Sequence, residues 1–181
     1  MWIDWSPHTT MAELTLNDLN RLEEPLFVSQ LGTVFEHSPW VAQAASTARP
    51  FTSLEELHRT MVEVVRLAPP DSQLKLIRAH PDLAGRAALA GELTDHSARE
   101  QAGAGLNSLS PEEYARFHNL NGCYLRKFDF PFVLAVKGHT KHSILASFEE
   151  RLKNDAEAER ARALDEIAKI ARFRLEELLR G

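Results

Sequence analysis

His80, followed directly by Pro81, is the first residue pair with a clear chemical use. The pair ends the helical pattern of residues 71–80, and a residue before proline is biased away from helical geometry. We therefore expect the His80 ring to leave the regular helical stack near the negative end of the helix dipole, which favours a protonated imidazole. Such a group suits proton transfer near neutral pH. A plain helix end with no further role is the alternative.

Ser97, Glu100 and Gln101 form a second group within one short segment. The spacing of Ser97 and Glu100 is that of a capping box, in which serine and glutamate satisfy each other's backbone amides. The start of a helix also gathers N–H donors that hold anions. An acid and an amide at such a place could orient a polar heterocycle, so capping and ligand binding both stay open.

The last helical pattern carries an arginine inside its apolar stripe. Arg174 falls among the apolar positions of this stripe, and Arg172 lies at its edge. A buried guanidinium needs a partner, because an unpaired buried charge is costly. The pattern predicts either a structural ion pair with Asp or Glu, or a bidentate grip on a substrate carboxylate or carbonyl.

Residues 128–138 are apolar, short and interrupted by Pro131 and Gly138. We expect this segment to be extended or irregular. Outside a sheet, its backbone N–H and C=O groups need partners, and a flat, amide-rich ligand could supply them. Simple burial in the core is the alternative interpretation.

His139 and His142 invite a metal interpretation, and a metal-dependent hydrolase using this pair is one alternative function. No HExxH or other strong ligand spacing accompanies the two histidines. We therefore expect no metal site.

Helices must position these residues, because apolar positions recur at helical spacing along most of the chain. Thr15 and Ser110 are expected N-caps, and Pro111 suits a first helical turn. No convincing sheet is found, so the expected fold is all-α. About nine helices are expected, over residues 15–23, 23–39, 39–47, 52–70, 71–80, 97–109, 110–128, 143–154 and 157–180.

The 181 residues fit one compact domain, which we place at 13–181, with residues 1–12 as a mobile leader. The net charge of −5 argues against a nucleic-acid partner. No run approaches the ~18 apolar residues of a membrane span. The single cysteine excludes an intramolecular disulfide. The sequence shows neither a secretory signal nor a peroxisomal tripeptide, so a cytoplasmic protein is expected.

Several strings together resemble the OHCU (2-oxo-4-hydroxy-4-carboxy-5-ureidoimidazoline) decarboxylases of urate breakdown. The strings are HPDLAG at 80–85, SAREQ at 97–101, LNGCYLRKFDFPFVLAVKG at 120–138, EHSPWVA at 36–42 and EIAKIARFRL at 166–175. The resemblance runs from about residue 13 to near the end of the chain. It implies an all-α homodimer that needs no cofactor and converts a small ureidoimidazoline to (S)-allantoin and CO2.

The resemblance also implies roles for individual residues. His80 resembles the catalytic general acid/base, Glu100 a second catalytic group and Arg174 the family's C-terminal arginine, with Arg172 as the alternative. The implied substrate-binding residues are Pro81, Ser97, Gln101, Phe132, Val133, Leu134, Ala135 and Val136. A non-catalytic all-α interaction module remains the other alternative to an enzyme.

Overall fold

The structure, a computed structural model, describes residues 14–85, 88 and 90–179 of the 181-residue chain. The leader predicted over residues 1–12 lies outside the described residues. The described part contains nine α-helices, one short 3-10 helix and no strand, which confirms the all-α prediction. The elements are α1 (Leu16–Arg21), α2 (Glu24–Leu31), α3 (Pro39–Ala45), η1 (Ser46–Ala48), α4 (Leu54–Leu67), α5 (Pro70–Ala79), α7 (Asp95–Gly103), α8 (Pro111–Phe128), α9 (Lys141–Arg151) and α10 (Ala156–Leu178).

Two of the expected helix starts are confirmed. Thr15 forms a capping box with Asp18 at the start of α1, and Ser110 forms one with Glu113 at the start of α8. In each box the hydroxyl accepts one backbone N–H and the carboxylate accepts another. Pro111 occupies the first turn of α8, where its missing N–H costs nothing.

The helix predicted over residues 23–39 is shorter than expected, because α2 ends at Leu31. A Cβ atom on Gly32 would lie 2.7 Å from the Val28 carbonyl oxygen and 3.3 Å from Pro39 Cβ. The chain therefore turns here through a space that only glycine fits, and residues 32–38 run as turns and bends to α3. The break takes Glu36 out of any helix, and its side chain is buried.

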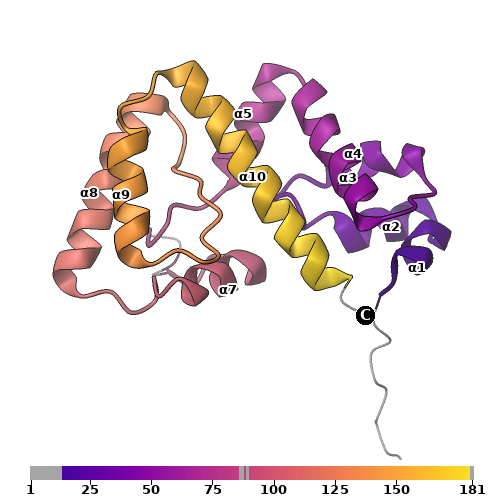
Figure 1. Ribbon diagram of the computed structural model, residues 1–181, viewed down its shortest axis with the longest axis horizontal. Helices are drawn as coiled ribbons and strands as arrows, with labels where there is room; N and C mark the ends of the chain where they lie inside the picture. Colours follow the sequence, from indigo (N-terminus) through magenta and orange to yellow (C-terminus); the bar gives the residue numbers. More distant parts are fainter. Residues whose placement is uncertain (1–13, 86–87, 89, 180–181) are drawn as a thin grey trace, which may run out of the picture.

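The long helix α10 is the central element. It contacts α4 and α5 on one side and α8 on the other, and Figure 1 shows it crossing the middle of the molecule between these two groups of helices. Its face includes Ile167, Ala171 and Leu175, which are almost completely buried. Arg174 shares this face, so the fold carries a charged group into its own interior.

Residues 131–136, called the extended segment below, belong to neither a helix nor a sheet, which agrees with the irregular segment predicted over 128–138, although Phe128 still belongs to α8. The Phe132 ring stacks on Phe148 with centroids 3.7 Å apart, and the Arg151 guanidinium lies 4.4 Å from the Phe132 ring centroid. Gly138 follows with φ 82°, a left-handed conformation that glycine adopts without strain. The segment is thus anchored by aromatic packing and ends in a glycine turn.

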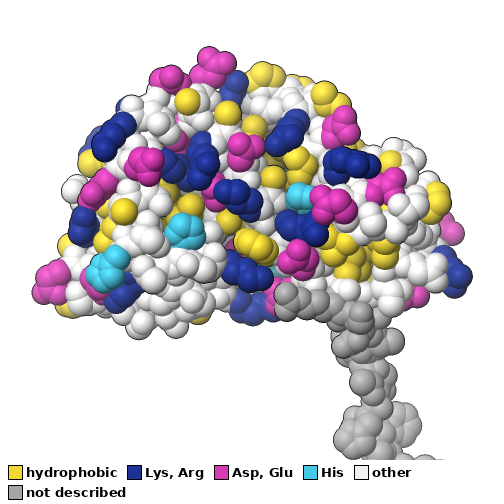
Figure 2. Space-filling model, viewed as in Figure 1, with side chains coloured by type: hydrophobic (Ala, Val, Ile, Leu, Met, Phe, Trp, Pro, Cys, Tyr) yellow, Lys and Arg dark blue, Asp and Glu magenta, His cyan; other side chains and the backbone are white. Residues whose placement is uncertain are grey.

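Acidic and basic side chains are interspersed over the face shown in Figure 2. None of the helices in the described part combines the length and the apolar composition that a bilayer crossing requires.

Candidate active site

His80 caps the C-terminus of α5 with extended backbone angles, φ −76° and ψ 138°, as expected before proline. Its Nδ1 lies 2.9 Å from the Leu76 carbonyl oxygen. Because a carbonyl only accepts, Nδ1 carries the proton, and Nε2 of the neutral ring is an acceptor. Nε2 is buried and has no hydrogen-bond partner among the described residues. This atom is therefore available to a ligand.

The protonation state of His80, which the sequence leaves open, is set by burial. Burial lowers the pKa of His80 to about 4, although the Leu76 carbonyl and the charge of Glu36 both raise it. The helix end acts in the expected direction, but desolvation of the imidazolium is the larger effect. His80 is therefore neutral near pH 7, unlike the state that the helix end alone would favour, and its Nε2 is a base.

Helix α7 begins one residue after Thr94, whose hydroxyl oxygen accepts the Ser97 backbone N–H. The Ser97–Glu100 capping box, one of the two interpretations that the sequence left open, does not form, because the helix starts earlier and Ser97 already lies inside its first turn. The consequence is that the Ser97 hydroxyl is free for other partners. It donates to Glu36 Oε2 at 3.2 Å and accepts from Arg174 Nη2 at 3.4 Å.

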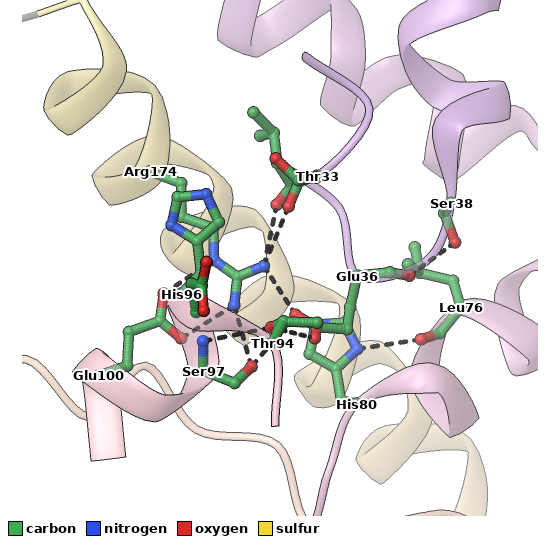
Figure 3. A network of polar contacts seen from close by, with 12 residues as sticks. Thr33, Glu36, Ser38, Leu76, His80, Thr94, His96, Ser97, Glu100 and Arg174 are labelled. Carbon is green, nitrogen blue, oxygen red and sulfur yellow. Dashed lines mark hydrogen bonds and ion pairs between the residues drawn. The ribbon is translucent and has the colours of Figure 1, made fainter. Parts of the chain in front are cut away.

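Arg174 is 1% exposed and is the centre of a polar network (Figure 3). Its Nε and Nη2 donate to the two carboxylate oxygens of Glu100 at 2.8 and 2.9 Å, a bidentate pair. Its Nη1 donates to Glu36 Oε2 at 2.8 Å. Burial opposes the charge of Arg174, but pairing with Glu100 and Glu36 outweighs this effect and raises the pKa of the guanidinium.

Arg172 lies outside this network. Its side chain is 32% exposed and pairs with Glu55 and Glu176 on the surface. The choice between the two arginines left open by the sequence is therefore made by the helix register, which turns Arg174 inward. The structural ion pair predicted for Arg174 is present, since its guanidinium is buried against Glu36 and Glu100. A substrate-binding role stays compatible with this placement, because Glu100 is itself a predicted site residue.

Gln101 lies beside the loop that follows His80. Its Oε1 accepts the Ala84 N–H at 2.9 Å, and its Nε2 donates to the Asp82 carbonyl at 3.3 Å. Ala84 has φ 51°, an uncommon conformation for a residue with a side chain. Asn121 adds a hydrogen bond of 2.9 Å to the Leu83 carbonyl. These contacts hold the loop, so a role of Gln101 in substrate binding stays a prediction.

One small hollow brings the predicted residues together. Its volume is about 30 Å³, roughly the space of one water molecule. It is lined by His80, Pro81, Leu83, Ser97, Glu100, Gln101, Phe132, Val133, Leu134, Val136, Ile170 and Arg174. Ala135 is the one predicted site residue absent from this lining, and it lies at an adjoining cavity of about 350 Å³. The larger cavity has the size of a small-molecule site.

The hollow and the cavity have four lining residues in common: Glu100, Val136, Ile170 and Arg174. The outer cavity is also lined by four titratable groups, His96, Arg99, Lys137 and Glu177, and Arg99 pairs with Glu177 at 2.6 Å. A ligand that reaches His80 through this cavity passes the Glu100 carboxylate first. The small hollow at His80 thus lies beside a larger vestibule that is lined by both basic and acidic side chains.

Two backbone groups of the extended segment are bound by side chains from α9 and α10. The Val133 carbonyl accepts from Arg151 Nη1 at 2.7 Å, and the Ala135 N–H donates to Glu166 Oε2 at 3.0 Å. The Leu134 N–H and C=O have no hydrogen-bond partner in the described part of the chain. Leu134 therefore has a backbone donor and an acceptor that a ligand could use.

His139 and His142 do not gather further ligands. His139 Nδ1 lies 3.0 Å from the Ser143 hydroxyl, and His142 is exposed in the first turn of α9. Within the ranges described, no group of three or more His, Cys, Asp or Glu residues is placed to hold a metal ion. The metal-dependent hydrolase hypothesis therefore finds no third ligand there.

Sequence reasoning missed Glu36 and Thr94. Thr94 donates to Glu36 Oε1 at 2.6 Å, and Glu36 is 2% exposed. The sequence does contain an indication of the buried Glu36. This residue directly follows the apolar pair Val34 and Phe35, and a charged side chain is rarely buried unless it has a partner. The assumption that a helix continued through this region hid it.

Comparison with known proteins gives a consistent result. The family model described as OHCU decarboxylase matches residues 20–176. A 2-oxo-4-hydroxy-4-carboxy-5-ureidoimidazoline decarboxylase of Haloferax volcanii is 46% identical over 92% of this chain and 97% of its own. The uric acid degradation bifunctional protein PucL of Bacillus subtilis is 43% identical over 91% of this chain and 33% of its own. The crystal structure of an (S)-allantoin synthase is 32% identical, with a TM-score of 0.75, over 92% of this chain and 54% of that one.

The likeness in sequence extends over almost the whole described chain and includes the elements that carry His80, Glu100 and Arg174. It agrees with the resemblance found from the short strings. The chain is thus a member of the OHCU decarboxylase family.

Proposed function

We propose that this protein is a carboxy-lyase that decarboxylates 2-oxo-4-hydroxy-4-carboxy-5-ureidoimidazoline to (S)-allantoin during urate degradation. The observation that carries the proposal is a neutral, buried imidazole whose Nε2 has no partner among the residues that the structure describes, at one hollow with a carboxylate held by a buried arginine. Family membership supplies the substrate class. The non-catalytic interaction module has no observation in its favour.

The substrate contains the electron acceptor that the reaction needs. The bond from the ring carbon to its carboxylate breaks, and the electron pair moves into the adjacent C=N system, whose nitrogen takes up a proton from water. The hydroxyl on the same carbon becomes a carbonyl as it loses its proton. The neighbouring carbon gains one proton on one face, which fixes the S configuration. A cofactor acting as electron sink is not required for this step.

His80 is suited to the two proton transfers. Its neutral Nε2 takes the hydroxyl proton, and the resulting imidazolium returns a proton to the neighbouring carbon. The Nδ1–H bond to the Leu76 carbonyl fixes the ring and the tautomer throughout. His80 therefore acts first as a base and then as an acid.

Glu100 and the extended segment orient the substrate in this proposal. Glu100 accepts a hydrogen bond from the substrate hydroxyl or a ureido N–H, and its position is set by the bidentate pair with Arg174. The Leu134 N–H and C=O match the C=O and N–H groups of a ureido or ring amide. Pro81, Ser97 and Gln101 complete the lining. The homodimer and the cytoplasmic location implied by the resemblance stay predictions.

The test uses freshly generated substrate, whose spontaneous decay gives racemic product, so that chirality reports the enzyme. Circular dichroism at allantoin wavelengths should show (S)-allantoin with the wild-type protein. General acid–base catalysis contributes roughly 10²–10⁴ in rate, so His80→Asn should lose at least about 100-fold. The matched control is His118→Asn, since His118 is exposed on α8 and should keep full activity. Near-normal (S)-allantoin formation by His80→Asn would remove His80 from the mechanism.

A further inference from the structure

We propose that Glu36 is a positioning residue of this site: it fixes the Arg174 guanidinium and supplies the buried negative charge that lets His80 take up a proton. The proposal rests on the proposed function for the step that it assists. It concerns a residue in the turn between α2 and α3, far in sequence from the other site residues.

Glu36 is held by three groups on its two carboxylate oxygens. Oε1 accepts from the Thr94 hydroxyl at 2.6 Å, and Oε2 accepts from the Ser97 hydroxyl at 3.2 Å and from Arg174 Nη1 at 2.8 Å. The Thr94 and Ser97 contacts come from the start of α7, and the Arg174 contact comes from α10 (Figure 3). Burial raises the pKa of Glu36, but Thr94 and Arg174 together hold it below its ordinary value. Glu36 is therefore a carboxylate at neutral pH.

The contacts make Glu36 the second anchor of Arg174. Nε and Nη2 of Arg174 are directed to Glu100, while Nη1 is directed to Glu36 and to the carbonyls of Thr33 and Val34 at 3.3 and 3.4 Å. With every donor group of the planar fork engaged, the guanidinium has one orientation. Arg174 in turn fixes Glu100. Removal of the Glu36 carboxylate should therefore make the Glu100 carboxylate more mobile, although Glu36 does not contact Glu100.

The charges of the network explain why two acids are present. Arg174 carries one positive charge, and Glu36 and Glu100 carry one negative charge each, so the three groups have a net charge of −1. When His80 takes a proton, the set becomes neutral. Without Glu36 the same step would create a net positive charge in a buried place, which is costly.

The groups around His80 agree with this assignment. Glu36 favours the imidazolium, whereas Arg174 and His37 disfavour it. Glu100 faces the same hollow from α7, and residues 132–136 of the extended segment contribute no titratable side chain. Glu36 is thus the buried acid whose charge acts on His80. Its oxygens are occupied by hydrogen bonds within the protein, so it does not contact the substrate directly.

Two variants separate charge from structure. Glu36→Gln keeps the shape and removes the charge, and Glu36→Asp keeps the charge. We expect Glu36→Gln to lower kcat about tenfold or more with KM changed less than about threefold, and Glu36→Asp to recover most of kcat. The control is Glu159→Gln, which removes a fully buried carboxylate from the Arg151 pair and should lower stability without changing the protonation of His80.

His80 can also be observed directly, without substrate, by NMR of histidine-labelled protein at pH 7 and pH 4.5. About a quarter of His80 should be protonated at pH 4.5 in the wild type, and less than about one twentieth in Glu36→Gln, since one lost charge should shift its titration by about one pH unit. Equal protonation and equal kcat in wild type and Glu36→Gln would overturn the proposal. So would an Asp variant as slow as the Gln variant. If the wild type forms no (S)-allantoin, the proposed function fails, while the NMR comparison still decides the charge effect.

Discussion

The buried, neutral His80 should make the protein lose stability in weak acid in a way that can be assigned to this one side chain. The pKa of His80 falls from 6.5 to about 4 on folding. Between these values the unfolded chain binds a proton that the folded protein does not, so the free energy of unfolding falls as the pH falls. Integrated from neutral pH to pH 4.5, the loss is about 2.5 kcal/mol. This is a sizeable part of the 5–15 kcal/mol typical of whole domains.

The assay is urea unfolding of wild type and His80→Gln, followed by far-ultraviolet circular dichroism at pH 7 and pH 4.5. The variant lacks the titrating ring, so the wild type should lose about 2.5 kcal/mol more than the variant between the two pH values. His96, whose pKa is also lowered by burial, is present in both proteins and cancels in the comparison. If both proteins lose the same free energy, His80 is not held as a buried neutral base, and the assignment of its role fails.

Two further substitutions test the network and the vestibule. Arg174→Lys replaces the planar guanidinium by a single ammonium, so it should lower the free energy of urea unfolding by about 3–5 kcal/mol and remove most of the activity. Arg172→Lys, at an exposed ion pair, should lower the free energy of unfolding by under about 1 kcal/mol. Equal losses in the two variants would contradict the inward placement of Arg174. Lys137 Nζ lies 4.5 Å from the Phe173 ring centroid at the outer cavity. Lys137→Gln should raise KM for the anionic substrate about two- to fivefold with kcat unchanged, and weaken its dependence on salt. The exposed Lys153→Gln should alter neither quantity, and an unchanged KM in Lys137→Gln would remove Lys137 from substrate capture.

Local rules predict much of this fold. The caps at Thr15 and Ser110 and the proline at the end of α5 are short-range signals, and each one appears at the expected residue. The sequence also predicts the non-helical segment before Gly138, because its apolar run is too short and too interrupted for a helix. These features depend on neighbours within a few residues, which is what a sequence pattern reports.

The features that failed depend on contacts across the chain. The end of α2 is fixed by the approach of Pro39 to Gly32, and the position of Glu36 depends on Arg174, 138 residues away. The protonation state of His80 could not be predicted from the sequence for the same reason: the helix end is local, but the desolvation that outweighs it comes from packing of distant elements. Local sequence patterns identify residues whose side chains are suited to catalysis. The protonation state of those side chains depends on burial, which the sequence pattern does not report.

In the proposed function, the backbone N–H and C=O of Leu134 have a consequence for how selectivity can change. A main-chain donor and acceptor at Leu134 persist whichever apolar residue stands there, so substitutions within the segment leave this part of ligand recognition intact. Altering it requires a different path of the chain, which the hydrogen bonds from Arg151 and Glu166 oppose. The preference for a ring with amide groups would then depend on Arg151 and Glu166, which hold the segment in place. Substitutions of the segment's own side chains would leave that preference unchanged.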